Sequence, residues 1–211
     1  MRTEFQTDFV TVVSGLPRSG TSMMMRMLEA GGMPVVVDHD RKPDPDNPNG
    51  YYEFEPIKAL KEDASWVAGA MGHAVKAVYL LLYDLPPQYQ YRVVFMRRDL
   101  PEVIASQDTM LRRSGSATGN LDATVLARHF ETQIRQVDAW LRRQPNFAVL
   151  YVKYADIVRD PAAAAEAIAA FLGGTLDAAK MAASVDPTLY RQRVAGLSLG
   201  KPASATPPPA G

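Results

Sequence analysis

The chain has 211 residues, and its 23 basic and 23 acidic side chains give a formal net charge of zero. This balance gives no support to binding of nucleic acid or of a strongly polyanionic substrate. Cysteine is absent, which excludes disulfides, thiolate metal sites and a cysteine nucleophile. The first residues lack the apolar core of a signal peptide, and no apolar run is long enough to span a bilayer. We therefore expect a cytoplasmic protein without a membrane span, with one domain over 1–200 and a disordered tail over 201–211.

Residues 10–28 have the layout of an anion-binding loop. Aromatic and β-branched residues over 9–13 predict a strand that is buried on both faces. Gly15 and Gly20 permit tight turns that bring backbone N–H groups close to an oxyanion. The helix that begins at Thr21 points its unpaired N–H groups back into the loop. Further donors come from the side chains of Arg18, Ser19, Thr21 and Ser22. The pattern predicts a phosphate or sulfate ligand.

The two glycines have the spacing of a Walker A motif, but the lysine position holds Thr21 and the cation lies inside the loop as Arg18. Residues 15–22, Gly-Leu-Pro-Arg-Ser-Gly-Thr-Ser, resemble the 5′-phosphosulfate-binding loop of sulfotransferases that use 3′-phosphoadenosine 5′-phosphosulfate (PAPS). In that family a lysine or arginine precedes Ser-Gly-Thr. The resemblance implies that this loop binds the donor and that Arg18 acts on the transferring group. A loop that binds another phosphate ligand, or none, is the alternative.

The next segment is predicted to be a short strand over 34–38, followed by a proline-rich surface loop or lid over 38–50. Three of its residues match an EF-hand loop, but Pro45 and Pro56 occupy the first and last ligand positions, so calcium is rejected. Glu53 and Glu55 follow among aromatic residues, where a carboxylate can act as a general base. The resemblance to sulfotransferases outside the cytosolic class implies Glu53 as the base, with Glu55 second. Both glutamates could instead lie at a helix N-terminus, which the helix dipole favours.

Lys76 is the charged residue in an otherwise apolar strand predicted over 73–82. Burial of such a charge is costly unless it faces a ligand or partner, so Lys76 is a candidate to assist the leaving phosphate. In cytosolic sulfotransferases the comparable lysine is followed two residues later by the histidine base. This chain has Val78 at that position, which favours a carboxylate base and weakens any direct transfer of the cytosolic mechanism.

A second anion motif lies at the end of a strand predicted over 93–96. Arg98 ends the strand, Asp99 and Glu102 have the spacing of a capping box, and Ser106 lies two turns into the helix. Arg-Asp-x-Pro-x-x-x-x-Ser resembles the 3′-phosphate-binding motif of sulfotransferases. The resemblance implies that Arg98 and Ser106 clasp the 3′-phosphate, a task that suits a guanidinium. A capped helix with a surface arginine is the alternative.

The rest of the chain predicts a long amphipathic packing helix over 121–143, a strand over 146–154 and an alanine-rich helix. Residues 154–161, Tyr-x-Asp-x-Val-x-Asp-Pro, resemble a further sulfotransferase segment to which no ligand contact is assigned. Arg191 and Arg193 lie where the family often places a basic element over the 3′-phosphate. The Arg-Lys-Gly pattern of the cytosolic class is absent there.

Together these patterns predict one three-layer α/β domain with a parallel five-stranded sheet and a P-loop-like phosphosulfate-binding loop. The resemblance implies in-line sulfuryl transfer from PAPS to a hydroxyl or amine of a small-molecule acceptor, with no metal. A nucleotide-dependent kinase of related fold and a non-catalytic nucleotide-binding member of the sulfotransferase fold remain the alternatives.

Overall fold

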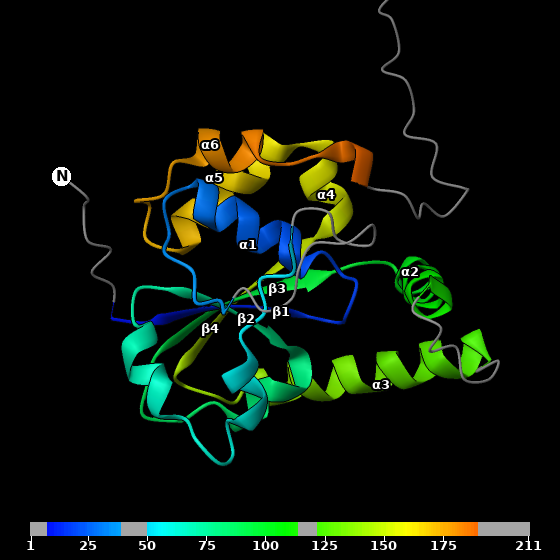
Figure 1. Ribbon diagram of the computed structural model, residues 1–211, viewed down its shortest axis with the longest axis horizontal. Coiled ribbons are helices and arrows are strands. Elements are labelled where there is room, and N and C mark those ends of the chain that lie inside the picture. Colours follow the sequence, from blue (N-terminus) through cyan, green and yellow to red (C-terminus); the bar gives the residue numbers. More distant parts are fainter. Residues whose placement is uncertain (1–7, 39–49, 114–121, 190–211) are drawn as a thin grey trace, which may run out of the picture.

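The computed structural model describes residues 8–38, 50–113 and 122–189 (Figure 1). Four parallel strands form one sheet in the order β2-β1-β3-β4. Their bounds are β1 Val10–Gly15, β2 Ala74–Val78, β3 Tyr91–Arg97 and β4 Phe147–Lys153. All six residues of β1 are buried, as expected for a central strand of a parallel sheet that is covered on both faces.

Helices cover both faces of this sheet, as Figure 1 shows. The α-helices are α1 Thr21–Ala30, α2 Leu100–Arg113, α3 Ala123–Leu141, α4 Tyr154–Arg159, α5 Pro161–Phe171 and α6 Ala178–Ala183. Short 3₁₀-helices are η1 Glu55–Ala59, η2 Ser65–Ala70, η3 Tyr79–Asp84 and η4 Pro187–Leu189. One core joins α1, α4, α5 and α6 to the sheet, and a second core joins α3 and the helices η1 to η3 to the opposite face. The three-layer α/β prediction is confirmed.

The predicted fifth strand is wrong. Residues 34–38 contribute only an isolated parallel bridge between Val35 and Ala74 beside β2. Pro34 lacks a backbone N–H and can only accept, here from Ala74. The chain then leaves the sheet, since the Asp38 amide donates to the carbonyl of Glu53 instead of to β2. A sheet of four strands results.

The predicted strand over 73–82 is shorter than expected. β2 ends at Val78, and the chain continues as the 3₁₀-helix η3. Tyr79 and Leu82 are its buried residues, and their spacing of three matches the repeat of a 3₁₀-helix. An uninterrupted apolar run thus contains two elements, which hydrophobicity alone does not separate. The long packing helix is confirmed as α3.

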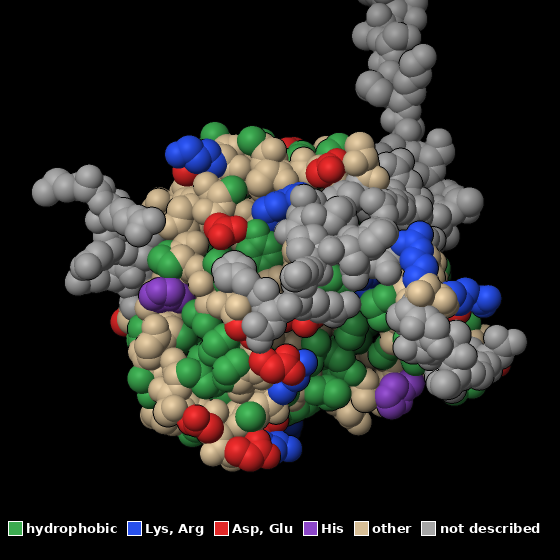
Figure 2. Space-filling model, in the orientation of Figure 1, with side chains coloured by type: hydrophobic (Ala, Val, Ile, Leu, Met, Phe, Trp, Pro, Cys, Tyr) green, Lys and Arg blue, Asp and Glu red, His purple; other side chains and the backbone are tan. Residues whose placement is uncertain are grey.

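The described surface carries charged side chains of both signs. Lys, Arg, Asp and Glu occur together across the face shown in Figure 2, consistent with the net charge of zero. Within the three described ranges, no helix combines the length and the apolar character needed to cross a membrane.

Candidate functional site

The anion loop connects β1 to α1 at the carboxyl edge of the sheet. Gly15 has φ +146° and Gly20 has φ +100°, a region that side chains rarely enter. A Cβ at Gly15 would also lie 2.7 Å from the carbonyl oxygen of Met96, and one at Gly20 would lie 2.4 Å from the ring of Tyr154. Both glycines are therefore required by space as well as by conformation.

Arg18 adopts the left-handed conformation, with φ +68°. For a residue other than glycine this conformation costs on the order of 1 kcal/mol. Such strain persists where the surrounding contacts hold it, and here the Arg18 carbonyl accepts a hydrogen bond of 3.2 Å from Nη1 of Arg98. The turn at Arg18 is held in part by the second anion motif.

The helix that follows the loop is suited to binding an anion. Among the described residues no side chain caps α1, and its first turn contains no acidic residue. Thr21 and Ser22 are its first two residues. The N-terminal N–H groups and the positive end of the helix dipole therefore lie at the loop. Ser19 is 1% exposed, and its hydroxyl has no hydrogen-bond partner in the described parts of the chain.

The two anion motifs are in direct contact. Nε of Arg18 donates to Oγ of Ser106 at 2.9 Å, and Arg98 donates to the Arg18 carbonyl as stated above. Arg18 and Ser106 lie 88 residues apart in the sequence. The structure thus brings together the loop arginine, the strand-end arginine and the helix serine that the two motifs contain.

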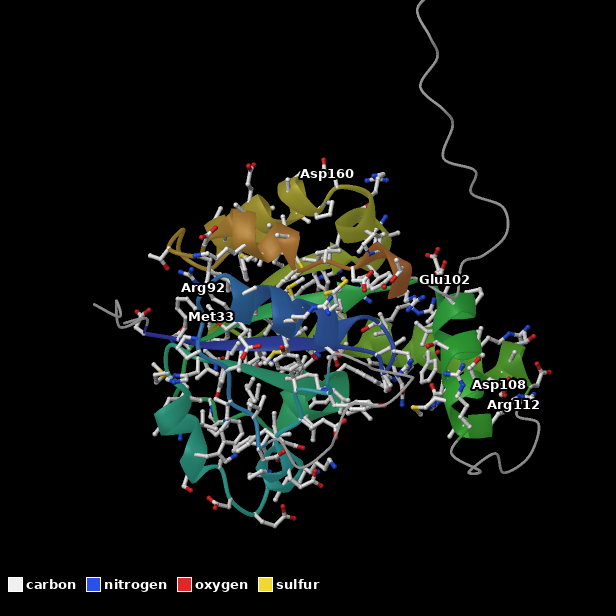
Figure 3. All side chains as sticks on the ribbon, turned by 45° about the horizontal axis from the view of Figure 1, so that its top comes forward. Met33, Arg92, Glu102, Asp108, Arg112 and Asp160 are labelled. Carbon is white, nitrogen blue, oxygen red and sulfur yellow. The ribbon has the colours of Figure 1, made fainter. Side chains whose placement is uncertain are left out.

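Arg98 is held on several sides. Its Nε donates to Oε2 of Glu102 at 3.0 Å, and the two side chains are 8% and 4% exposed. Figure 3 labels Glu102 on α2. The guanidinium carbon of Arg98 also lies 4.5 Å from the ring centroid of Tyr154, a cation–π distance. Burial raises the pKa of the Tyr154 phenol, against the opposing effect of nearby Arg98.

Sequence reasoning assigned Glu102 only to helix capping and missed its pairing with Arg98. The available signal was the spacing of four between the two residues, which places them on one face of a helix. Arg98 lies two residues before the start of α2, so the helical spacing applies to it only because the chain already turns there.

Lys76 of β2 and Glu53 lie near each other, on the side of β1 opposite to β3. Nζ of Lys76 is 3.9 Å from Oε1 of Glu53, and the side chains are 14% and 28% exposed. Lys76 also donates a short hydrogen bond to the carbonyl of Tyr51, and the Ser22 hydroxyl donates to the same oxygen at 3.2 Å. These two hydrogen bonds connect the segment around Tyr51, which leads to Glu53, to both β2 and α1.

Glu55 has a different environment. Its carboxylate accepts from Nζ of Lys58 at 2.6 Å, and its side chain is 60% exposed. It is the first residue of η1, as the interpretation of a helix N-terminus expected. Arg191 and Arg193 lie outside the described residues. In the described ranges, no group of three or more His, Cys, Asp or Glu side chains is arranged to hold a metal ion.

Comparison with known proteins bears on this site. Residues 81–178 match the model of a family described as the sulfotransferase family. The match covers somewhat less than half of the chain, and it shows that this part resembles sulfotransferases. The match includes Arg98 and Ser106 and ends before the C-terminal residues, whereas the anion loop precedes it in the sequence.

Two solved structures are similar to this chain. The sulfotransferase domain of the olefin synthase of Synechococcus PCC 7002 is 17% identical, with 92% of this chain and 89% of that chain covered and a TM-score of 0.49. A sulfotransferase domain from the curacin biosynthetic pathway is 14% identical, with 90% and 93% covered and a TM-score of 0.48. No curated protein matches the sequence.

Proposed function

We propose that this protein is a sulfotransferase that moves a sulfuryl group from PAPS to a hydroxyl or amine of a small-molecule acceptor. The observation that carries the proposal is the contact of Arg98 and Ser106 with Arg18. PAPS has two anionic groups, a 5′-phosphosulfate and a 3′-phosphate. Two anion motifs in contact at one edge of the sheet suit a ligand of that kind.

The donor is assigned to the two motifs as follows. The loop and the start of α1 receive the 5′-phosphosulfate through Gly15, Arg18, Ser19, Gly20, Thr21 and Ser22. Backbone N–H groups at an uncapped helix N-terminus support this role. Arg98 and Ser106 receive the 3′-phosphate. The pairing of Arg98 with Glu102 fixes the guanidinium before the donor arrives.

In the proposed reaction the acceptor oxygen or nitrogen attacks sulfur in line, and the bond between sulfur and the bridging phosphate oxygen breaks. Glu53 accepts the acceptor proton, and Lys76 stabilises the negative charge on the leaving phosphate. Arg18 balances charge on the sulfuryl oxygens. The products are a sulfate ester or sulfamate and adenosine 3′,5′-bisphosphate. These are positioning and electrostatic tasks, so the mechanism calls for no metal.

Glu53 is preferred to Glu55 as the base on two grounds. It lies beside Lys76, whereas Glu55 pairs with Lys58. It is also half as exposed as Glu55, at 28% against 60%. A carboxylate shielded from water next to the group that stabilises the leaving phosphate is better placed to act on a bound acceptor.

Transfer of labelled sulfuryl from PAPS to a panel of phenols and amines tests the proposal. Arg18→Ala should lower kcat about a hundredfold or more, because it removes a charge that acts on the transferring group. Arg98→Ala should instead raise the donor KM about tenfold, the effect of about 1.4 kcal/mol of lost binding. Arg112 is the control, since it is exposed and pairs with Asp108 on α2 (Figure 3). Full activity in Arg18→Ala would refute the assignment.

A further inference from the structure

Val78 is an apolar residue that is exposed beside the candidate site. It is the last residue of β2 and is 43% exposed, whereas Ala74, Val75 and Ala77 of the same strand are buried. A single exposed apolar side chain is common and by itself indicates nothing. The residues around Val78 at the carboxyl edge of the sheet decide whether it has a role.

Val78 lies directly beside the anion loop. In the register of the two strands it is opposite Gly15, where the loop begins, and neighbouring strands are about 4.8 Å apart. β1 separates β2 from β3. Ser19 and Arg98 border a cavity at the end of β3 that is part of the donor site, and Val78 lies on the other side of β1. It is therefore next to the proposed place of the transferring group and away from the proposed 3′-phosphate site.

Val78 also shares a face of the sheet with Lys76. Side chains alternate between the two faces along a strand. Ala74 belongs to the core on the α1 face, whereas Val75 and Ala77 belong to the core on the opposite face. Lys76 and Val78 are therefore on the α1 face, and the extended backbone of Val78, with φ −64° and ψ 147°, keeps this alternation. Val78 is the residue that follows Lys76 on this face, towards the loop.

Glu53 and Lys76 limit the path by which an acceptor can approach. Oε1 of Glu53 and Nζ of Lys76 are 3.9 Å apart. A hydroxyl that gives its proton to Glu53 while it attacks a sulfuryl group at the loop must lie between these groups and the loop. Because Val78 occupies this edge of the sheet, the carbon atoms next to such a hydroxyl would lie against Val78.

The 3₁₀-helix η3 continues the apolar surface beyond Val78. Leu80 and Tyr83 are spaced by three, the repeat of a 3₁₀-helix, so they share one face of η3. They are 47% and 39% exposed. The ring of Tyr83 lies edge-on to that of Trp140 on α3, with the ring centroids 4.8 Å apart, and this contact holds η3 against α3. An apolar surface therefore begins beside the loop and continues along η3.

This surface offers no charge to an acceptor. Residues 78–83 contain no charged side chain. The next residue, Asp84, already has its Oδ1 3.7 Å from Nζ of Lys61. A charged or strongly hydroxylated body would lose water against residues 78–83 without gaining a charged partner from them, whereas a neutral apolar body would lose nothing of this kind.

We propose that Val78 and Leu80 bind the acceptor, and that the acceptor is a neutral alcohol or phenol with an apolar carbon skeleton beside its hydroxyl. Val78 contacts the skeleton near the reacting hydroxyl, and Leu80 contacts it further away. This inference rests on the proposed function, because it assumes that the loop holds the sulfuryl donor. It narrows the acceptor from any hydroxyl or amine to one chemical class and names two residues that determine specificity.

Two phenols that differ only at the end of a side chain test the inference. They are 4-propylphenol and 3-(4-hydroxyphenyl)propionate, in which a carboxylate replaces the terminal methyl group. Val78→Thr and Leu80→Gln make the surface polar with little change in side-chain volume. Val125→Thr is the matched control, because Val125 lies on α3 and is 58% exposed. Calorimetry on protein saturated with adenosine 3′,5′-bisphosphate measures acceptor binding, and labelled PAPS measures transfer.

Wild-type protein should bind and sulfate 4-propylphenol about tenfold or more in preference to the propionate. Val78→Thr should weaken binding of both phenols about fivefold, less than a closed apolar pocket would lose, because Val78 is 43% exposed. Leu80→Gln should weaken only 4-propylphenol and so reduce the preference. Val125→Thr should match wild type. The affinity for the bisphosphate should be the same in all four proteins, which excludes an indirect effect through the donor site.

Two results would overturn the inference alone. One is wild-type protein that binds the bisphosphate but shows no preference for 4-propylphenol. The other is a pair of variants, Val78→Thr and Leu80→Gln, that bind both phenols as wild type does. Failure of wild-type protein to bind the bisphosphate would instead overturn the proposed function, so the two failures are distinguishable.

Discussion

Replacing Glu102 with alanine should destabilise the protein by about 3 kcal/mol. The side chains of Arg98 and Glu102 are 8% and 4% exposed, and they are joined by a hydrogen bond of 3.0 Å. Removal of one partner from a buried ion pair leaves an uncompensated charge and costs about 3–5 kcal/mol. The lower end applies here, because Arg98 keeps the carbonyl of Arg18 and the ring of Tyr154.

The free energy of unfolding is measured by urea unfolding, and Tm by thermal unfolding, both followed by circular dichroism. For a chain of this length, a loss of about 3 kcal/mol lowers Tm by roughly 6–12 °C. Asp108→Ala is the control, because it breaks a pair of the same i,i+4 spacing whose side chains are 67% and 56% exposed. That change should cost less than about 0.5 kcal/mol.

A double variant completes the test. Arg98→Met with Glu102→Leu replaces the pair by apolar side chains, which is often neutral or stabilising for a buried pair. The double variant should therefore be more stable than Glu102→Ala. If Glu102→Ala costs no more than Asp108→Ala, the account of Arg98 as a buried cation held by Glu102 is refuted.

Three further predictions concern the loop, the tyrosines and the base. In urea unfolding, Gly20→Ala should be less stable than Gly32→Ala by about 1 kcal/mol or more. Both positions have φ near +100°, but only at Gly20 would a Cβ clash with a neighbouring ring, that of Tyr154. Equal losses of stability would exclude this clash. Burial raises the pKa of Tyr91 and Tyr154 above the ordinary value of 10.0. Because folding then favours the neutral phenols, their contribution to stability is complete below pH 10 and is lost as pH rises above it. A free energy of unfolding that stays flat through this range would contradict the assignment. Glu53→Gln should reduce kcat about a hundredfold or more without changing bisphosphate affinity, while Glu55→Gln stays near wild type; the reverse order would identify Glu55 as the base.

The layered α/β class and the core of the anion loop were predictable because their signals are local. The buried run of β1, the two glycines and the start of α1 at Thr21 follow one another within twenty residues, and each has its own physical cause. The amphipathic spacing of α3 is likewise local. Periodicity and turn chemistry are therefore sufficient for these elements.

The number of strands was not predictable because it depends on pairing. Residues 34–38 have the composition of a strand, yet they make one bridge to Ala74 and then turn towards Glu53. Whether an apolar segment joins a sheet is decided by the edge that it meets. The sequence of the segment contains no such information.

The candidate site was predictable as a set of residues but not as a set of contacts. Arg98 and Ser106 were expected to share one anion, whereas the structure also joins Ser106 to Arg18 and Arg98 to Glu102. The partners of Lys76 depend on how residues 50–54 fold back against β2 and α1. The contacts of Arg18 with Ser106 and of Lys76 with Tyr51 join residues that lie far apart in the sequence, and no local pattern encodes them. The pair of Arg98 and Glu102 has the local spacing of four and could have been predicted.

The most direct test of the central claim is a thermal-shift comparison of adenosine 3′,5′-bisphosphate without metal against ATP with magnesium. At about one hundred times its Kd the bisphosphate should stabilise the protein by about 2.7 kcal/mol, which corresponds to a rise in Tm of roughly 5–10 °C. Magnesium ATP should give a clearly smaller rise, and Arg98→Ala should reduce the response to the bisphosphate. A rise with magnesium ATP alone would contradict the account and would favour a nucleotide-dependent kinase.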